Sequence, residues 1–210
     1  MTFETWLAFT AASLVIIVIP GPSILLILSY ALSRGKSVAI AAAFGVGLGD
    51  LFAMTASLVG LGALMLTSAT AFLIIKWVGV IYLVWMGWRM ILSTRKTVLD
   101  IPPNSADLGA QGIFRHVTIV TALNPKSIGF FVAFAPQFIV YEQPFVPQAV
   151  ILTATYVILG IANAFLYAMA AAHMRTFIRR PAILTWITRM GGATLIAMGA
   201  LTAFLRRPAT

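Results

Sequence analysis

The stretch VIIVIPGPSILLI, residues 15–27, places Pro20, Gly21 and Pro22 inside an otherwise unbroken apolar run. Proline lacks the backbone N–H that a helix interior needs, and its ring clashes with the preceding turn. The carbonyls freed by such a break cannot be satisfied by lipid, so in a membrane the break must be buried in protein or line a wet cavity. The stretch therefore predicts either a kink needed only for packing or a broken helix at a site inside the membrane.

The composition indicates that the chain lies in a membrane. Apolar residues make up 61% of its 210 residues, charged residues only 9%, and the mean hydropathy is +1.01. A soluble domain of this size needs more polar surface. Nearly charge-free runs recur at about the 20-residue length that crosses ~30 Å of hydrocarbon. We expect an all-α integral membrane protein with six transmembrane helices, over residues 5–31, 38–66, 70–92, 116–140, 145–173 and 184–205.

The residue counts exclude several kinds of site. The chain has no cysteine, which excludes disulfides, thiolate metal ligands and thiol redox chemistry. With two histidines and five acidic residues, we expect neither a metal nor another cofactor. Neither HExxH nor GxSxG occurs, so we expect no enzyme and no catalytic residues. The net charge of +9 would suit nucleic acid, but the basic residues lie at the ends of apolar runs, where they orient a membrane protein instead.

Basic residues are concentrated in alternate connections. Lys and Arg occur in the connections at 32–37, 93–115 and 174–183. The connections between them, near 67–69 and 141–144, contain neither. Under the positive-inside rule, the basic connections face the cytoplasm and both termini lie outside. A pair of arginines near the C-terminus runs against this orientation.

Two pairs of expected helices share a sequence pattern. GLGDLF in the second helix resembles GIANAF in the fifth, which pairs Asp50 with Asn163. GVIYLVWMG in the third resembles GGATLIAMG in the sixth, and Pro20 of the first corresponds to Pro125 of the fourth. A repeat with an odd number of spans has to be inverted relative to its copy. The alternative is that these small residues merely let helices approach closely.

The repeat divides the chain at its longest polar connection. We expect a single transporter domain, with repeat 1 at about 1–92, a cytoplasmic linker at about 93–115 and repeat 2 at about 116–210. Helices one and four are then equivalent, and both are interrupted at prolines. Interrupted helices in corresponding places indicate a shared central binding site.

Charged residues at membrane depth indicate where this site lies. A charge at the bilayer centre costs about 2.5–3.5 kcal/mol on insertion scales, so Asp50 and Lys126, deep in the expected spans, require an explanation. Asp50 could alternate between protonated and ionised forms as the site opens to each side. It would then be a proton-coupling group or an ammonium receptor. A static ion pair between Asp50 and Lys126 is the structural alternative.

Groups beside the two breaks complete the expected site. Pro22 suits the first turn of a resumed half-helix, whose free N–H groups could receive a carboxylate. Lys126 follows the break at Asn124 and Pro125, and its ammonium could attract a carboxylate. Asn163 could hydrogen-bond either end of a zwitterion. The expected substrate-binding residues are Pro20, Gly21, Pro22, Asp50, Asn124, Pro125, Lys126 and Asn163.

Six motifs follow one another through essentially the whole chain. They are PGP at 20–22, RG at 34–35, GLGD at 47–50, KWVGVIYLVWMG at 76–87, NPKS at 124–127 and PQF at 136–138. In order and spacing they resemble the LysE/RhtB family of small exporters. The resemblance implies a six-helix, multi-pass protein of the bacterial inner membrane that expels amino acids or close derivatives, driven by the proton gradient. All the expected site residues except Asn163, which depends on the repeat alone, fall on these motifs.

These observations predict a secondary active exporter of amino acids or amino-acid derivatives. A small zwitterionic substrate would bind between the two broken helices and be exposed alternately to each side, with protons as the coupling partner. The alternatives are an exporter of another small cation or solute, and a membrane channel or non-transporting subunit. The sequence leaves the identity of the substrate and the oligomeric state open, a homodimer included.

Overall fold

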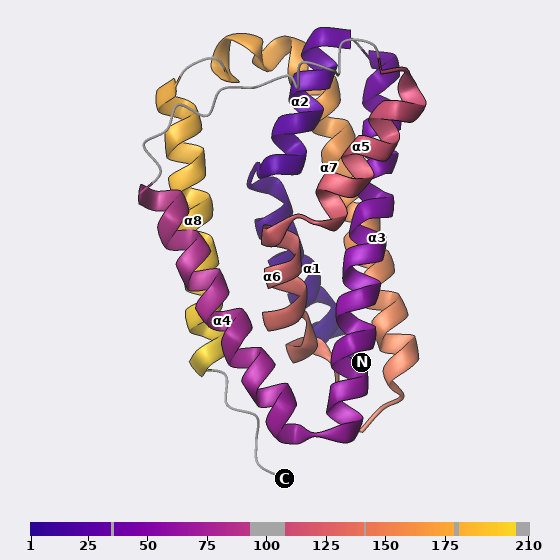
Figure 1. Ribbon diagram of the computed structural model, residues 1–210, viewed down its shortest axis with the longest axis vertical. Coiled ribbons are helices and arrows are strands. Elements are labelled where there is room, and N and C mark those ends of the chain that lie inside the picture. Colours follow the sequence, from indigo (N-terminus) through magenta and orange to yellow (C-terminus); the bar gives the residue numbers. More distant parts are fainter. Residues whose placement is uncertain (35, 93–107, 141, 179–180, 205–210) are drawn as a thin grey trace.

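The chain, seen in a computed structural model, is built from helices. The structure describes residues 1–34, 36–92, 108–140, 142–178 and 181–204. Over these residues all regular secondary structure is helical, and most helices run along the long axis of the molecule (Figure 1). The expected all-α fold is confirmed. Most of the expected linker at 93–115 lies outside the described residues.

Both predicted interruptions are present. The first expected span consists of α1 (Phe3–Val18) and α2 (Pro22–Arg34), which are bent by 54° at the break between them. The fourth consists of α5 (Ala110–Ala122) and α6 (Pro125–Ala133), with a bend of 44°. Proline stands at the first position of the second half-helix in each case, where its missing N–H costs nothing. The two breaks are therefore built in the same way.

The rest of the described chain forms one short 3-10 helix and four long helices. They are α3 (Lys36–Thr67), α4 (Ala69–Leu92), η2 (Ala135–Phe138), α7 (Phe145–Ile178) and α8 (Pro181–Phe204). The bounds of α3 and α4 agree closely with the expected spans. The expectation that the fourth span begins at 116 is wrong, because α5 begins at Ala110. The fully buried Ile113 fixes its first turns in the core.

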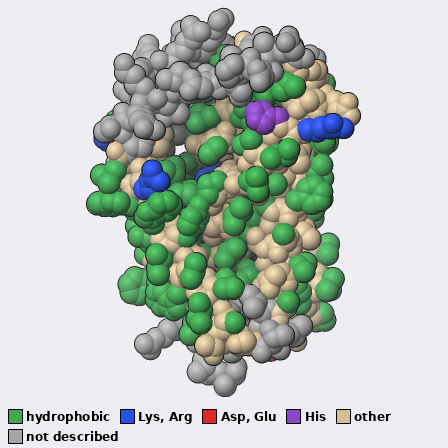
Figure 2. Space-filling view, viewed as in Figure 1, with side chains coloured by type: hydrophobic (Ala, Val, Ile, Leu, Met, Phe, Trp, Pro, Cys, Tyr) green, Lys and Arg blue, Asp and Glu red, His purple; other side chains and the backbone are tan. Residues whose placement is uncertain are grey.

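Five of the six expected spans are long and apolar enough to cross a membrane, if each bent pair counts as one span. Among the described residues, the single helices have apolar windows at Ile40–Ala63, Leu73–Leu92 and Phe145–Ala171. On the face seen in Figure 2, hydrophobic side chains cover the middle of the molecule, and the exposed Lys and Arg side chains lie nearer one end. The chain is a membrane protein. The membrane crossing of α8 stays a prediction.

Glycines bring neighbouring helices close together. α3 packs against both α5 and α7, and α4 packs against α8. A Cβ on Gly49 would lie 2.6 Å from the carbonyl oxygen of Thr118, so α3 can approach the backbone of α5 only with glycine at that position. A Cβ on Gly87 of α4 would meet the carbonyl of Gly192 in α8. Close packing of small residues therefore occurs at both interfaces.

The contacts between α4 and α8 are reciprocal. Gly87 of α4 meets Gly192 of α8, and Gly199 of α8 approaches the carbonyl of Val80 in α4. When the two halves are aligned, Gly87 corresponds to Gly199 and Val80 to Gly192. Exchanging the halves therefore maps one contact onto the other. This reciprocity is what a two-fold relation requires and supports the inverted repeat, which stays a prediction.

Aromatic rings fill the core on the α1 and α6 side of the breaks. The ring of Phe130 lies 6.2 Å from that of Phe9 in α1 and 5.6 Å from that of Tyr156 in α7. Phe131 packs edge-on against Tyr156 at 4.7 Å. All four rings are at most 2% exposed. They form a buried aromatic cluster next to the region where the chain breaks.

Candidate functional site

The break after α1 leaves the carbonyls of Ile16 to Ile19 without helical partners. The last four C=O groups of any helix lack intrahelical donors. Pro20 and Pro22 have no N–H, so the donors that would face Ile16 and Val18 in a continued helix are missing as well. These carbonyls form the negative end of the α1 dipole. At membrane depth they must be satisfied by protein or by water.

Side chains from the second half of the chain satisfy all four carbonyls. The ammonium of Lys126 donates to the carbonyls of Ile16, at 2.9 Å, and Ile19, at 2.7 Å. The amide of Asn163 donates to that of Ile17 at 3.1 Å. The hydroxyl of Tyr167 donates to that of Val18 at 2.7 Å. The broken end of α1 is thus held by α6 and α7.

The second break is capped by its own residues and is hydrogen-bonded to the first break. Asn124 caps α6, because its side-chain oxygen accepts a hydrogen bond from the backbone N–H of Lys126 at 3.0 Å. Its side-chain nitrogen donates to the hydroxyl of Ser23, in the first turn of α2, at 3.0 Å. Each break therefore stabilises the other, and the two meet in the middle of the molecule.

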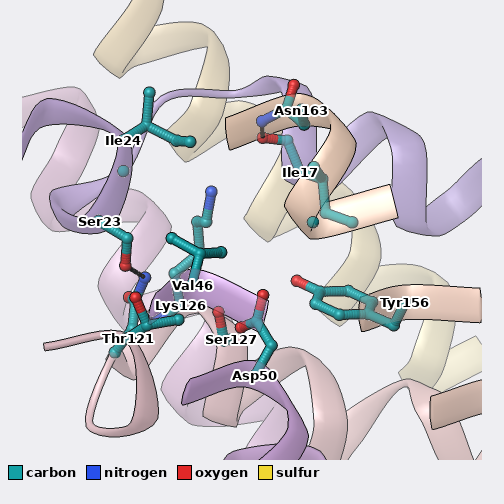
Figure 3. A pocket seen from close by; sticks show the side chains of 13 residues that line it. Ile17, Ser23, Ile24, Val46, Asp50, Thr121, Lys126, Ser127, Tyr156 and Asn163 are labelled. Carbon is teal, nitrogen blue, oxygen red and sulfur yellow. Dashed lines mark hydrogen bonds between the residues drawn. The ribbon is translucent and has the colours of Figure 1, made fainter. Parts of the chain in front are cut away.

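A cavity of about 30 Å³ lies between the breaks. It is lined by Ile17, Gly21, Ser23, Ile24, Val46, Asp50, Thr121, Asn124, Lys126, Ser127, Tyr156, Gly160 and Asn163 (Figure 3). Five of the eight expected site residues are in this lining. The other three, Pro20, Pro22 and Pro125, do not line it. Pro22 and Pro125 are exposed and act by starting α2 and α6.

Asp50 points into this cavity from α3. Its side chain is 4% exposed, and its Oδ1 atom has no hydrogen-bond partner. A Cβ on Gly160 of α7 would lie 2.9 Å from Oδ2, so the glycine leaves room for the carboxyl group. The hydroxyl groups of Ser127 and Tyr156 face the same carboxyl group (Figure 3). A buried carboxyl oxygen without a partner is costly, which marks it as a candidate functional group.

The static ion pair between Asp50 and Lys126 is not the arrangement seen. Both side chains lie in the described part of the chain and line the same cavity, close enough to interact electrostatically. The ammonium of Lys126 nevertheless bonds to the α1 carbonyls, while Asp50 Oδ1 stays unpaired. The two charged groups are therefore neighbours that do not form an ion pair with each other.

Sequence reasoning missed four polar groups of the cavity: Ser23, Thr121, Ser127 and Tyr156. Three of them stand within three positions of a break, so proximity to PGP and NPKS could have identified them. Tyr156 lies in the middle of α7, where its sequence context gives no signal. The hydroxyl of Thr121 is buried without a hydrogen-bond partner, as is Asp50 Oδ1. The cavity thus holds two polar atoms without a hydrogen-bond partner.

The cavity is smaller than an amino acid. About 30 Å³ accommodates one or two water molecules. A larger ligand requires that side chains or helices around the cavity move. The break brings together the carbonyl end of α1 and the first N–H groups of α2, which are helix ends of opposite partial charge.

Comparison with known proteins gives one family. A family model described as "LysE type translocator" matches residues 14–205. An "uncharacterized membrane protein" of Vibrio cholerae is 32% identical over 206 residues, covering 97% of this chain and 98% of the relative. A "homoserine/homoserine lactone efflux protein" of Salmonella typhimurium is 31% identical, covering 98% and 99%.

A more distant similarity extends over part of the chain. A "leucine efflux protein" of Klebsiella pneumoniae is 30% identical over 134 residues, which cover 64% of this chain and 63% of the relative. No solved structure matches the chain.

Proposed function

The chain belongs to the LysE type translocator family, and we propose that it is a secondary active exporter of amino acids or amino-acid derivatives. The named relatives are efflux proteins for homoserine, homoserine lactone or leucine, whose common feature is an α-amino group. The observation that carries the proposal is the cavity between the two breaks. It brings together at membrane depth a buried carboxyl group, a buried ammonium group and residues from the ends of α1 and α2.

The two ends of the first break suit the two ends of a zwitterion. Ser23 and Ile24 line the cavity and belong to the first turn of α2, whose N–H groups form the positive end of the helix dipole. They are positioned to receive the substrate carboxylate. The carbonyl end of α1 suits an ammonium group. Thr121, Asn124 and Asn163 add polar groups around the space between these two ends.

Alternating access would use the closures on either side of the cavity. On one side, Tyr30 of α2 and His116 of α5 share a hydrogen bond of 2.7 Å. On the other, Phe9 of α1 packs against Phe130 and Phe138, with ring centroids 6.2 and 5.3 Å apart. Rocking of the two halves would break the contacts of one closure while those of the other closure stay formed. Both closures join a half-helix of the first span to one of the fourth.

Proton coupling would use Asp50. It is a buried carboxyl group that faces the cavity and is accessible to each side in turn as the closures alternate. The proposed setting is the bacterial inner membrane, with the Tyr30 and His116 end toward the cytoplasm and both termini outside. The basic Arg115, near the start of α5, lies at that end.

The proposal can be tested in liposomes. The purified protein is reconstituted, a pH gradient is imposed, and labelled homoserine, leucine, threonine and lysine are followed. We expect saturable counterflow and gradient-driven accumulation of at least one of them. Asp50→Asn should retain counterflow and lose accumulation, whereas Glu142→Gln, at an exposed acid outside the cavity, should keep both. Flux that does not saturate would indicate a channel, and no movement of any amino acid would reject the proposed export.

A further inference from the structure

Lys126 occupies the position that a substrate ammonium group would take. Its Nζ atom is bonded to the carbonyls of Ile16 and Ile19, at the negative end of α1. Its Nζ and Cε atoms both lie 3.2 Å from the place of a Cβ on Gly21, so the side chain fills the space beside the break. A primary ammonium on a flexible stem is chemically equivalent to the α-ammonium of an amino acid. The empty carrier therefore holds an ammonium group of its own at this position.

A second acceptor for the Lys126 ammonium lies in the same cavity. Asp50 Oδ1 is buried without a hydrogen bond, and the lysine stem ends in rotatable bonds that allow its ammonium to change partner. Buried charge requires a partner, so a Lys126 displaced from α1 would have to find another acceptor. Among the described residues that line the cavity, Asp50 is the acidic one.

We propose that substrate binding moves Lys126 from the α1 carbonyls to Asp50, and that this exchange of partners couples export to protons. The proposal depends on the exporter function proposed above. The substrate ammonium takes the carbonyls of Ile16 and Ile19, and its carboxylate meets the N-terminus of α2. Lys126 then pairs with Asp50 in its ionised form. Lys126 thus acts as a tethered competitor for the ammonium subsite and not as an anchor for the substrate carboxylate.

The protons and charges of this cycle balance. In the empty carrier Asp50 is protonated and Lys126 carries one positive charge. When substrate binds, the O–H bond of the Asp50 carboxyl group breaks, its proton leaves to water on that side, and Lys126 keeps all of its protons. The loaded site, with ionised Asp50, Lys126 and a zwitterion, is neutral. Release of substrate on the opposite side restores the proton to Asp50, so one proton moves inward for each amino acid exported.

Apart from Lys126, the described side chains that line the cavity with Asp50 carry no charge at neutral pH. From α7 it is faced by the hydroxyl of Tyr156, and from α6 by that of Ser127 (Figure 3). Thr121 of α5 and Ser23 of α2 contribute uncharged hydroxyl groups to the cavity. Among the charges of the chain itself, the Lys126 ammonium is therefore the one that moves beside Asp50 during the cycle.

The test measures proton release on substrate binding. Calorimetric titration of the full-length protein in two buffers with different protonation enthalpies gives the number of protons released. The probes are L-homoserine and, in parallel, L-leucine. For the wild type we expect one proton per substrate. Lys126→Met should bind substrate several-fold more tightly, because the competitor is gone, and should release no proton. Lys76→Met, at a lysine outside the cavity, should behave as the wild type.

Two further variants keep the proposal open to rejection if Lys126→Met does not fold. Asp50→Asn should release no proton and bind more weakly, because Lys126 loses its second partner. Gly21→Ala crowds Lys126 in its position on α1. We therefore expect it to bind substrate more tightly than the wild type and to release fewer protons.

The outcomes separate this proposal from the export function. Weaker binding by Lys126→Met, or full proton release from it, would overturn the exchange of partners while leaving export intact. Unchanged affinity and proton release in Gly21→Ala would overturn it as well. If neither amino acid binds or shows counterflow, the export of these substrates is rejected, and the exchange is rejected with it.

Discussion

Asn163 illustrates how a single side chain serves both stability and the site. Its amide donates a hydrogen bond to the carbonyl of Ile17, and both residues are buried. We expect Asn163→Leu to destabilise the protein by about 1–3 kcal/mol, the cost of an unsatisfied buried acceptor. In detergent, the unfolding temperature should fall by about 2–4 °C for each kcal/mol. Thr194→Val is the control, since that exposed hydroxyl bonds only to its own helix at Met190. If the two variants unfolded at the same temperature, the assigned role of Asn163 would be contradicted.

Tyr156 combines a packing ring with a hydroxyl group in the cavity. Tyr156→Phe keeps the ring against Phe130 and Phe131 and removes only the hydroxyl. If the hydroxyl binds the substrate, loss of that hydrogen bond, worth about 0.5–1.5 kcal/mol, should raise the substrate KM about twofold to tenfold. The melting temperature should not change. Tyr156→Ala should also destabilise the fold by about 3–5 kcal/mol, because it leaves a cavity in the buried aromatic cluster. A Tyr156→Phe variant with wild-type KM would exclude the hydroxyl from the site.

Prediction from sequence succeeded for the buried charges and failed for their partners. Asp50 and Lys126 stand out because charge at membrane depth is expensive. Their partners depend on the rotation of α3 and α6 about their axes, which spacing in the sequence does not fix. The ammonium of Lys126 therefore proved to satisfy the first break, although the sequence associates it with the second.

At the scale of helices, the separation of α3 from α5 depends on Gly49. A Cβ there would lie 2.6 Å from the carbonyl oxygen of Thr118 and 2.6 Å from the Cβ of Thr121, so the two helices would have to move apart. We expect Gly49→Ala to lower the melting temperature and to impair transport, because Thr121 lines the cavity. Overpacking of this kind costs about 1–3 kcal/mol. Gly60→Ala, on the same helix and in open space, should change neither. Tolerance of Gly49→Ala would show that α5 is free to adjust.

The element boundaries that the sequence predicted best are those set by proline. Pro22 and Pro125 begin α2 and α6, as the missing N–H of proline requires. The start of α5 precedes the predicted span because hydropathy marks only the expected lipid boundary, whereas the helix extends beyond it for as long as its side chains find contacts. Ile113 supplies such a contact in the first turns of α5.

At the scale of the whole molecule, the two breaks explain why the candidate site needs both halves of the chain. Donors from α6 and α7 hold the end of α1, and Asn124 holds the start of α2. Without these donors the α1 carbonyls would lack partners in lipid. The matching prolines made this central meeting point predictable from sequence. The reciprocal contacts of α4 and α8 were not, because they depend on which glycines face each other.

The orientation of the molecule can be tested on a chain that has no cysteine of its own. Gln111, in the first turn of α5, and Glu142, before α7, are both exposed and belong to opposite ends of the helices. The excess of Lys and Arg around the α5 end predicts that it faces the cytoplasm. In cells with a permeabilised outer membrane, an impermeant maleimide should therefore label Glu142→Cys and not Gln111→Cys, which should react only after lysis. The reverse pattern would place the Tyr30 and His116 closure on the outer side, and the order in which the proposed exporter opens its two ends would have to be inverted.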